Sequence, residues 1–265
     1  MRCLFLGDVV GQPGMTALKQ MLKQLTQSLK PDLVIANGEN AHVSGKGITR
    51  EIVHSFYQMG IDVITLGNHA WDQKEIFDFL DRETRIVRPA NYPEGTPGVG
   101  YVLIERDNRT IAVCNLMGRS FLPPLDCPFR KADELIDKLR PKTSHIIVDF
   151  HAEASAEKIA MAWHLDGRVS AIVGTHTHVQ TADERILPNG TAFISDVGMV
   201  GAYDGVIGID RDVVRTKFLT QLPVRFQVQT GRWQLNAVLI DLNKDTGQAE
   251  SIRRIRIDDD HPWMD

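Results

Sequence analysis

Short apolar runs alternate with helical patterns through the first third of the chain. The runs at residues 2–6, 33–36 and 63–66 have the length and composition of buried strands. A helix is predicted between the first two runs, because apolar residues recur there at helical spacing, at Met15, Leu18, Leu22, Leu25 and Leu29. Further helices are predicted over residues 49–59, with Thr49 as the N-cap, and over residues 74–80. This alternation predicts a sheet with helices packed on it.

In the middle of the chain, the spacing of the apolar residues changes. The runs at residues 101–105 and 110–115 flank Asp107-Asn108 and predict a β-hairpin. The proline-containing stretch 116–128 predicts a surface loop. Two more helices are predicted, over residues 130–139 and 155–165. Three more strands are predicted, at residues 145–150, 171–174 and 192–194.

The last part of the chain predicts antiparallel strands at residues 225–229, 234–241 and 251–257. We interpret Gly198-Met199-Val200-Gly201 as a flexible loop. The sequence contains no internal repeat and no linker. We therefore expect a single domain, residues 1–265, of the α/β class, with two layered, mixed β-sheets sandwiched by helices.

Composition excludes several classes of protein. The 265 residues are 43% hydrophobic and 24% charged, which rules out collagen-like, coiled-coil and wholly disordered chains. No apolar run approaches the roughly 18 residues that a membrane span needs. The first residues do not resemble a signal peptide, so we expect a cytoplasmic protein without membrane contact.

Charge and cysteine content narrow the chemistry further. The net charge of −4 shows no basic excess, so RNA stays open as a partner but is not favoured. The three cysteines form no C-x-x-C pair, which argues against a disulfide framework or a thiolate zinc site. A homo-oligomer stays open as well.

Polar side chains of similar chemistry follow five of the predicted strands. These side chains are Asp8, Glu39 with Asn40, Asn68 with His69, His151, and His176 with His178. Ligands of open α/β sheets bind at the carboxyl ends of the strands. We therefore expect the five clusters to form one constellation in space.

Each of these residues alone has a simpler interpretation. An aspartate at a strand end is more often a helix cap or a turn former, Asn68 fits a turn, and Glu39 fits a solvated loop. The pair of His176 and His178 is a stronger signal, because alternate residues of an extended segment can converge on nearby positions. Taken together, carboxylate, amide and imidazole groups without thiolates favour a site for manganese, iron, zinc or a similar divalent ion.

The same residues, in the same order, resemble the calcineurin-like metallophosphoesterases. The resemblance rests on Asp8, Gly38-Glu39-Asn40, Gly67-Asn68-His69, His151 and Gly174-Thr175-His176-Thr177-His178. Two departures from the common pattern match one subgroup, the YmdB-like phosphodiesterases. They are Asp8-Val9-Val10 in place of D-x-H, and Gly38-Glu39-Asn40 in place of the G-D block. The resemblance covers almost the whole chain.

The resemblance implies two divalent metal ions per chain, with iron or manganese favoured because imidazoles supply several of the ligands. It implies that the ligands of one ion are Asp8, Asn40 and His178. The ligands of the other would be Asn68, His151 and His176, with Glu39 as the bridge between the ions. His69 would be the proton donor. The missing D-x-H histidine requires the loop of Asn40 to fold back toward Asp8.

The function that the resemblance implies is metal-dependent hydrolysis of cyclic nucleotides or related small phosphodiesters, by attack of a metal-bridging hydroxide on phosphorus. A phosphomonoesterase or nucleotidase is an alternative, because the same metal core serves both ester types. A regulatory metalloprotein with incidental turnover is a second alternative. The presence of His69 together with the whole ligand set argues against an inactive protein but leaves a regulatory role open.

Overall fold

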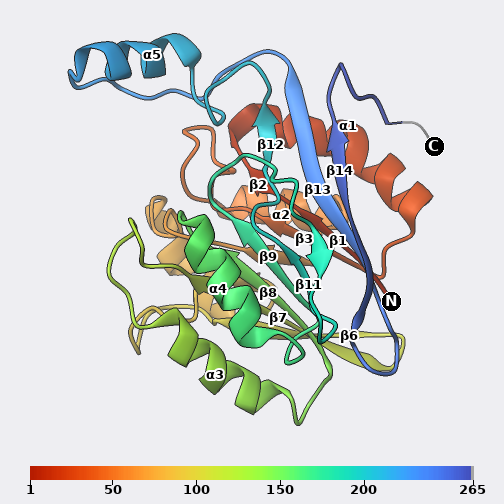
Figure 1. Cartoon of the computed structure of the whole chain (residues 1–265). Helices are drawn as coiled ribbons and strands as arrows, with labels where there is room; N and C mark the ends of the chain where they lie inside the picture. The colour runs from red at the N-terminus through yellow and green to blue at the C-terminus, as the bar shows by residue number, and fades with distance from the viewer. Residues whose placement is uncertain (264–265) are drawn as a thin grey trace.

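Residues 1–263, which the computed structural model describes, form two β-sheets that pack face to face, with helices on both outer faces (Figure 1). The strands of the first sheet, in spatial order, are β2 (Asp8–Val9), β12 (Met199–Ala202), β13 (Trp233–Leu242), β1 (Arg2–Leu6), β3 (Leu33–Asn37), β4 (Val63–Thr65) and β5 (Ile86–Val87), with β14 (Ala249–Ile257) also paired to β13. The strands of the second sheet are β10 (Arg185–Ile186), β11 (Ala192–Ile194), β9 (Ala171–Thr175), β8 (His145–His151), β7 (Arg109–Met117) and β6 (Tyr101–Arg106). The expected α/β fold of two layered, mixed sheets is confirmed.

The central strands of both sheets run parallel. β1, β3 and β4 pair in parallel, with Leu6 opposite Ala36. β7, β8 and β9 pair in parallel as well. Because Glu39, just after β3, touches His151 at the end of β8, the two sheets present the carboxyl ends of these strands on the same side of the molecule.

Helices cover the outer faces of the sheets (Figure 1). The helices on the first sheet are α1 (Gly11–Leu29) and α2 (Arg50–Gln58). The helices on the second sheet are α3 (Pro128–Leu139) and α4 (Ser155–Leu165). A further helix, α5 (Arg211–Thr220), extends away from both layers. No helix within residues 1–263 combines the length and the apolar character that crossing a lipid bilayer requires.

Local sequence explains the two helices that flank the first polar loop. The face of α1 that carries Leu18, Leu22 and Leu25 is buried against the sheet, as its spacing predicts. α2 begins after Thr49, whose side-chain oxygen accepts a hydrogen bond from the Ile52 N–H at 3.4 Å.

The space between the sheets changes from apolar to polar along the strands. On the inward face of β8, Ile147 is followed at every second position by Asp149 and His151, all of them buried. β3 shows the same change, since Asn37 and then Glu39 continue its inward face. The apolar half forms the core between the layers, and the polar half lies at the carboxyl ends of the strands.

Two sequence-based predictions in the last third of the chain are wrong. The supposed flexible loop at residues 198–201 contributes to β12, a buried strand parallel to β2 and antiparallel to β13. Its glycines reflect close packing rather than flexibility, because a Cβ on Gly201 would lie 3.1 Å from Val10 Cβ. Residues 225–229 form no strand; Val228 makes only an isolated bridge to Ile209. The preceding α5 was not expected, because it buries a single apolar residue, Val214, and leaves Phe218 and Leu219 exposed.

Two element boundaries also differ from the prediction. Residues 74–80 lie in two 3₁₀ turns, η1 (Lys74–Asp78) and η2 (Leu80–Arg82), because the segment is too short to repay the cost of nucleating an α-helix. The loop predicted over residues 116–128 is shorter, since β7 continues to Met117 and Pro128 opens α3. Proline is favoured at that first helical position because its missing N–H would have no partner there.

Gly174→Ala is expected to destabilise this fold. A Cβ at Gly174 would lie 1.7 Å from the Ser195 carbonyl oxygen, a backbone atom that cannot rotate away. We expect the free energy of unfolding, measured by urea denaturation, to fall by at least about 2 kcal/mol. Gly95→Ala is the control, because its Cβ meets nothing within 4 Å and carries only the strain of a positive φ. Equal losses for both variants would contradict the prediction.

Candidate metal centre

The polar side chains singled out in the sequence meet where the carboxyl ends of the two sheets face each other. Asp8 begins β2 directly after β1, and His151 is the last residue of β8. The remaining ones lie in the turns that follow β3, β4 and β9: Glu39 and Asn40, Asn68 and His69, and His176 and His178. Because each side chain lies within a few residues of a buried strand, the sheets themselves fix its position.

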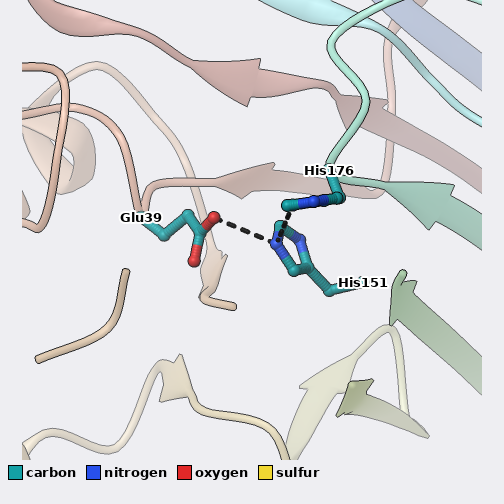
Figure 2. Close-up of side chains that lie close together, drawn as sticks. All are labelled: Glu39, His151 and His176. Carbon is teal, nitrogen blue, oxygen red and sulfur yellow. Dashed lines mark hydrogen bonds and ion pairs between the residues drawn. The ribbon is translucent and has the colours of Figure 1, made fainter. Parts of the chain in front are cut away.

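Three side chains from different strand ends point toward one another in Figure 2: Glu39, His151 and His176. His151 Nε2 lies 3.0 Å from Glu39 Oε1 and 3.1 Å from His176 Nδ1. The amide oxygen of Asn68 lies 2.9 Å from the same Nε2 atom. A carboxylate, two imidazoles and an amide oxygen therefore converge on one point, each with a metal-binding atom turned inward.

Two buried oxygens next to this group have no hydrogen-bond partner among residues 1–263: Asp8 Oδ1 and Asn40 Oδ1. The Asn40 amide nitrogen donates to the Gly45 carbonyl at 2.9 Å, which determines where its oxygen points. Asp8 Oδ2 accepts the His176 N–H at 3.1 Å. Leaving a buried acceptor unpaired costs about 1–3 kcal/mol, so a cation bound at this place would remove a penalty that the chain otherwise carries.

His178 belongs to this second group of side chains. Its Nδ1 lies 2.9 Å from the Ile207 carbonyl oxygen, which directs the other ring nitrogen elsewhere. Burial raises the pKa of Asp8, and the nearby imidazoles of His178 and His151 oppose the rise. The loop of Asn40 folds back toward Asp8, because the Gly11 N–H donates to the Asn40 carbonyl at 2.9 Å. The backbone of Asn40 therefore lies beside the start of α1, three residues after Asp8.

Gly67 leaves room at the centre of the site. A Cβ at this position would lie 2.3 Å from His151 Nε2 and 2.5 Å from Glu39 Oε2. Only a residue without a side chain leaves these two donor atoms accessible to an ion. The donor set and the space around it therefore fit a divalent transition-metal ion.

Several polar residues that sequence reasoning did not assign to the site orient its histidines. His151 Nδ1 lies 2.9 Å from Thr175 Oγ1, and the Thr175 hydroxyl donates to Asp149 Oδ1 at 2.7 Å. This chain places the proton of the neutral ring on Nδ1 and the lone pair on Nε2. Glu153 acts in the same way on His176, since its Oε2 lies 3.0 Å from the ring Nε2. The only sequence signal was local: Asp149 lies two residues before His151 on the same strand face.

His69 lies apart from the converging side chains, although its neighbour Asn68 is one of them. Its Nδ1 lies 2.8 Å from Asp72 Oδ2, and its side chain is 24% exposed. Its backbone N–H donates to Glu39 Oε2 at 2.8 Å. The ring is therefore held by Asp72 and the backbone by Glu39, and the ring is accessible to a substrate in a way that buried His151 is not.

The electrostatics of the site are dominated by one buried ion pair. Burial would raise the pKa of Glu39, but the adjacent His151 imidazolium lowers it to about 2. Burial would lower the pKa of His151, but Glu39 and Asp8 raise it to about 9. Burial and the charge of His151 together lower the pKa of His176 to about 3. In the metal-free protein, a protonated His151 therefore provides the positive charge of the site.

Comparison with known proteins extends these observations to the whole chain. The family model described as YmdB-like protein matches residues 4–255. A 2',3'-cyclic-nucleotide 2'-phosphodiesterase of Bacillus subtilis is 55% identical over 265 residues, which is 100% of both chains. The crystal structure of a phosphatase from Mycoplasma pneumoniae is 37% identical, with a TM-score of 0.92 over 97% of this chain and 93% of that one.

A more distant solved structure shares the fold. It is a calcineurin-like phosphoesterase from Bacillus subtilis, 14% identical, with a TM-score of 0.59 over 97% of this chain and 90% of that one. The architecture expected from the motifs is therefore the one that this class of enzymes uses.

Metal uptake at neutral pH is expected to release protons. His151, with a pKa of about 9 in the metal-free protein, must lose its proton before Nε2 can bind a cation. The apparent affinity for Mn²⁺ should therefore rise with pH up to about 9 and then level off. Calorimetric titration at pH 7.5 in buffers of different ionisation enthalpy measures the proton count, which we expect to be about one per His151.

A matched variant controls for histidines outside the site. His164→Asn removes a ring that pairs with Asp133 in the outer helices and should leave the proton count unchanged. Mn²⁺ binding without proton release at pH 7.5 would contradict the proposed charge state of His151.

Proposed function

The chain belongs to the YmdB-like family, and from this premise we propose that it is a metal-dependent phosphodiesterase for cyclic nucleotides or related small phosphodiesters. The observation that carries the proposal is the convergence of oxygen and nitrogen ligands on one buried point, with two acceptor oxygens beside it that have no partner within residues 1–263. Such a site has little use in a protein that binds no cation.

We assign the ligands to two divalent ions, iron or manganese by the chemistry of the donors. The first ion would be held by Asp8, Asn40 and His178. The second would be held by Asn68, His151 and His176. Glu39 would bridge them: its Oε1 lies 3.0 Å from His151 Nε2 in the second group, and its charge, after burial, is among the causes that raise the pKa of Asp8 in the first.

Bound cations would neutralise the phosphoryl oxygens of a substrate and make water a stronger nucleophile. The chain's own residues do the rest. His69 would deliver a proton to the leaving oxygen from its Nε2 atom, since Asp72 occupies Nδ1. The hydrogen bond from the His69 backbone N–H to Glu39 fixes the position of His69 relative to the ligands. Thr175 and Asp149 keep His151 in the tautomer that binds a cation.

A small substrate suits the surroundings of the site. A cleft of about 280 Å³ opens beside His178, lined by Gln180, Gln234, Asn236 and Arg254 among others. Its volume lies just below the range for small-molecule sites, which begins at about 300 Å³. The relative from Bacillus subtilis carries the name of an enzyme for 2',3'-cyclic nucleotides, and we propose the same substrate class here.

Because the similar structure from Mycoplasma pneumoniae is described as a phosphatase, a phosphomonoesterase is the rival function. A panel of 2',3'-cyclic nucleotides, nitrophenyl diesters and the matching monoesters, assayed with Mn²⁺-loaded protein, separates the two. We expect the catalytic efficiency kcat/KM to be highest for a cyclic diester. A monoester hydrolysed faster than every diester would replace the proposed function with its rival.

Replacing the bridge should affect both ions. Glu39→Ala is expected to lower the metal content of purified protein from about two ions per chain to well below one, because a bridging carboxylate serves both positions. Elemental analysis of protein prepared without chelators measures the content. Glu157→Ala is the control, since Glu157 binds only the backbone N–H groups of Arg119 and Ser120 in a neighbouring loop. Equal metal contents for both variants would refute the bridging role.

His69→Ala separates proton donation from metal binding. We expect this variant to keep its metal ions and to lose about 10²–10⁴-fold in kcat on a cyclic nucleotide, the usual contribution of a general acid. The loss on a nitrophenyl diester should be smaller, because nitrophenolate leaves readily without a proton. Equal losses on both substrates, with chemistry limiting the rate, would remove His69 from the role of the acid.

A further inference from the structure

A buried carboxylate outside the proposed ligand set, that of Asp196, is hydrogen-bonded to the segment that carries two of the ligands. Asp196 lies just before β12 and is 1% exposed. Its Oδ2 accepts a hydrogen bond from the Thr177 N–H at 3.0 Å and a second from the Thr177 hydroxyl at 2.7 Å. Thr177 is the residue between His176 and His178, so this contact acts directly on the spacing of the two rings.

A buried lysine on the covering helix completes the arrangement. Lys158 of α4 donates from Nζ to the same Asp196 Oδ2 at 2.7 Å, and both side chains are at most 2% exposed. A lysine is almost never fully buried unless it is paired. Because removing either partner would leave an isolated charge in the interior, the pair ties α4 firmly to the histidine segment.

The second oxygen of Asp196 reaches the opposite side of the site. Its Oδ1 accepts the Gly198 N–H at 2.8 Å. The Gly198 carbonyl in turn accepts the Asp8 N–H at 3.1 Å. A single carboxylate thus connects α4, the His176–His178 segment and the backbone of Asp8.

The histidine segment needs such support because its backbone is strained. His176 has φ 103° and His178 has φ 65°, both in the left-handed region that side chains other than glycine rarely adopt. Strained residues of this kind persist only where surrounding contacts hold them. The contacts that Asp196 makes to Thr177 lie between the two strained residues.

Only a carboxylate fits the groups around Asp196. Its side-chain oxygens face two backbone N–H groups, a hydroxyl and an ammonium group, all of which donate here. An asparagine of the same shape would turn its NH₂ group toward one of these donors and lose at least one contact. Asp196→Asn is therefore a small change in volume but a large change in hydrogen bonding.

We propose that Asp196, neutralised by Lys158, is a positioning residue that holds His176 and His178 in the geometry required for metal binding. Its effect on the metal rests on the proposed function. The hydrogen bonds from Thr177 to Asp196 do not rest on it, because they need no metal ion. The two parts can therefore be tested separately.

The first test measures hydrogen–deuterium exchange of residues 175–180 in the metal-free protein. Asp196→Asn and Thr177→Val should raise the exchange rate of this segment by about tenfold or more, because local opening becomes easier. Thr177→Ser keeps the hydroxyl, so its exchange rate in this segment should stay close to that of the unsubstituted protein. Asp241→Asn is the control: it breaks the ion pair with Arg2 at the other end of β1 and should not change exchange in this segment.

The second test measures Mn²⁺ affinity of the same variants by electron paramagnetic resonance. Residues that orient metal ligands typically contribute 10–100-fold in affinity, so Asp196→Asn and Thr177→Val should bind Mn²⁺ at least about tenfold more weakly. Thr177→Ser and Asp241→Asn should bind it normally. If Asp196→Asn does not fold, the comparison of Thr177→Val with Thr177→Ser decides.

The outcomes distinguish the positioning role from the proposed function. Unchanged exchange in Asp196→Asn and Thr177→Val would refute the claim that Asp196 holds the segment around Thr177. Faster exchange with unchanged Mn²⁺ affinity would overturn its positioning role. If the unsubstituted chain binds no Mn²⁺, the metal-dependent function is refuted. The exchange data would still test whether Asp196 holds the segment around Thr177.

Discussion

The structure depends on a charge problem at the carboxyl ends of its parallel strands. Asp8 and Glu39 are buried carboxylates, and acceptor oxygens of Asp8 and Asn40 have no partner within residues 1–263. Burying such groups is costly unless a positive charge is close by. In the metal-free chain His151 supplies that charge, and it is positioned where a cation would bind. The site is thus built for a cation before one arrives.

The two sheets contribute different halves of this site. The proposed oxygen ligands all follow strands of the first sheet, namely Asp8, Glu39, Asn40 and Asn68. The proposed nitrogen ligands all come from the ends of strands in the second, namely His151, His176 and His178. The apolar core between the layers therefore does more than stabilise the fold, because it sets the distance between the two kinds of ligand. Occupation of the site is expected to be coupled to the packing of one sheet on the other.

The sequence predicted the candidate ligands because each follows an apolar run, and parallel strands bring such positions to one edge. It did not reveal the residues that orient them. Thr175 and Asp196 act between elements, and no local pattern in the sequence distinguishes them from ordinary polar residues. β12 was missed because its glycines, which allow close packing, resemble a loop in sequence. α5 was missed because, apart from Val214, its large apolar residues are exposed, as Phe218 and Leu219 are.

Anomalous X-ray diffraction from crystals soaked in Mn²⁺ tests the central claim most directly. The account predicts two strong peaks at the carboxyl edge of the sheets. One would lie among Asn68, His151 and His176, the other among Asp8, Asn40 and His178, with Glu39 between them. Peaks confined to other parts of the surface, or a strand edge without any peak at saturating Mn²⁺, would contradict it.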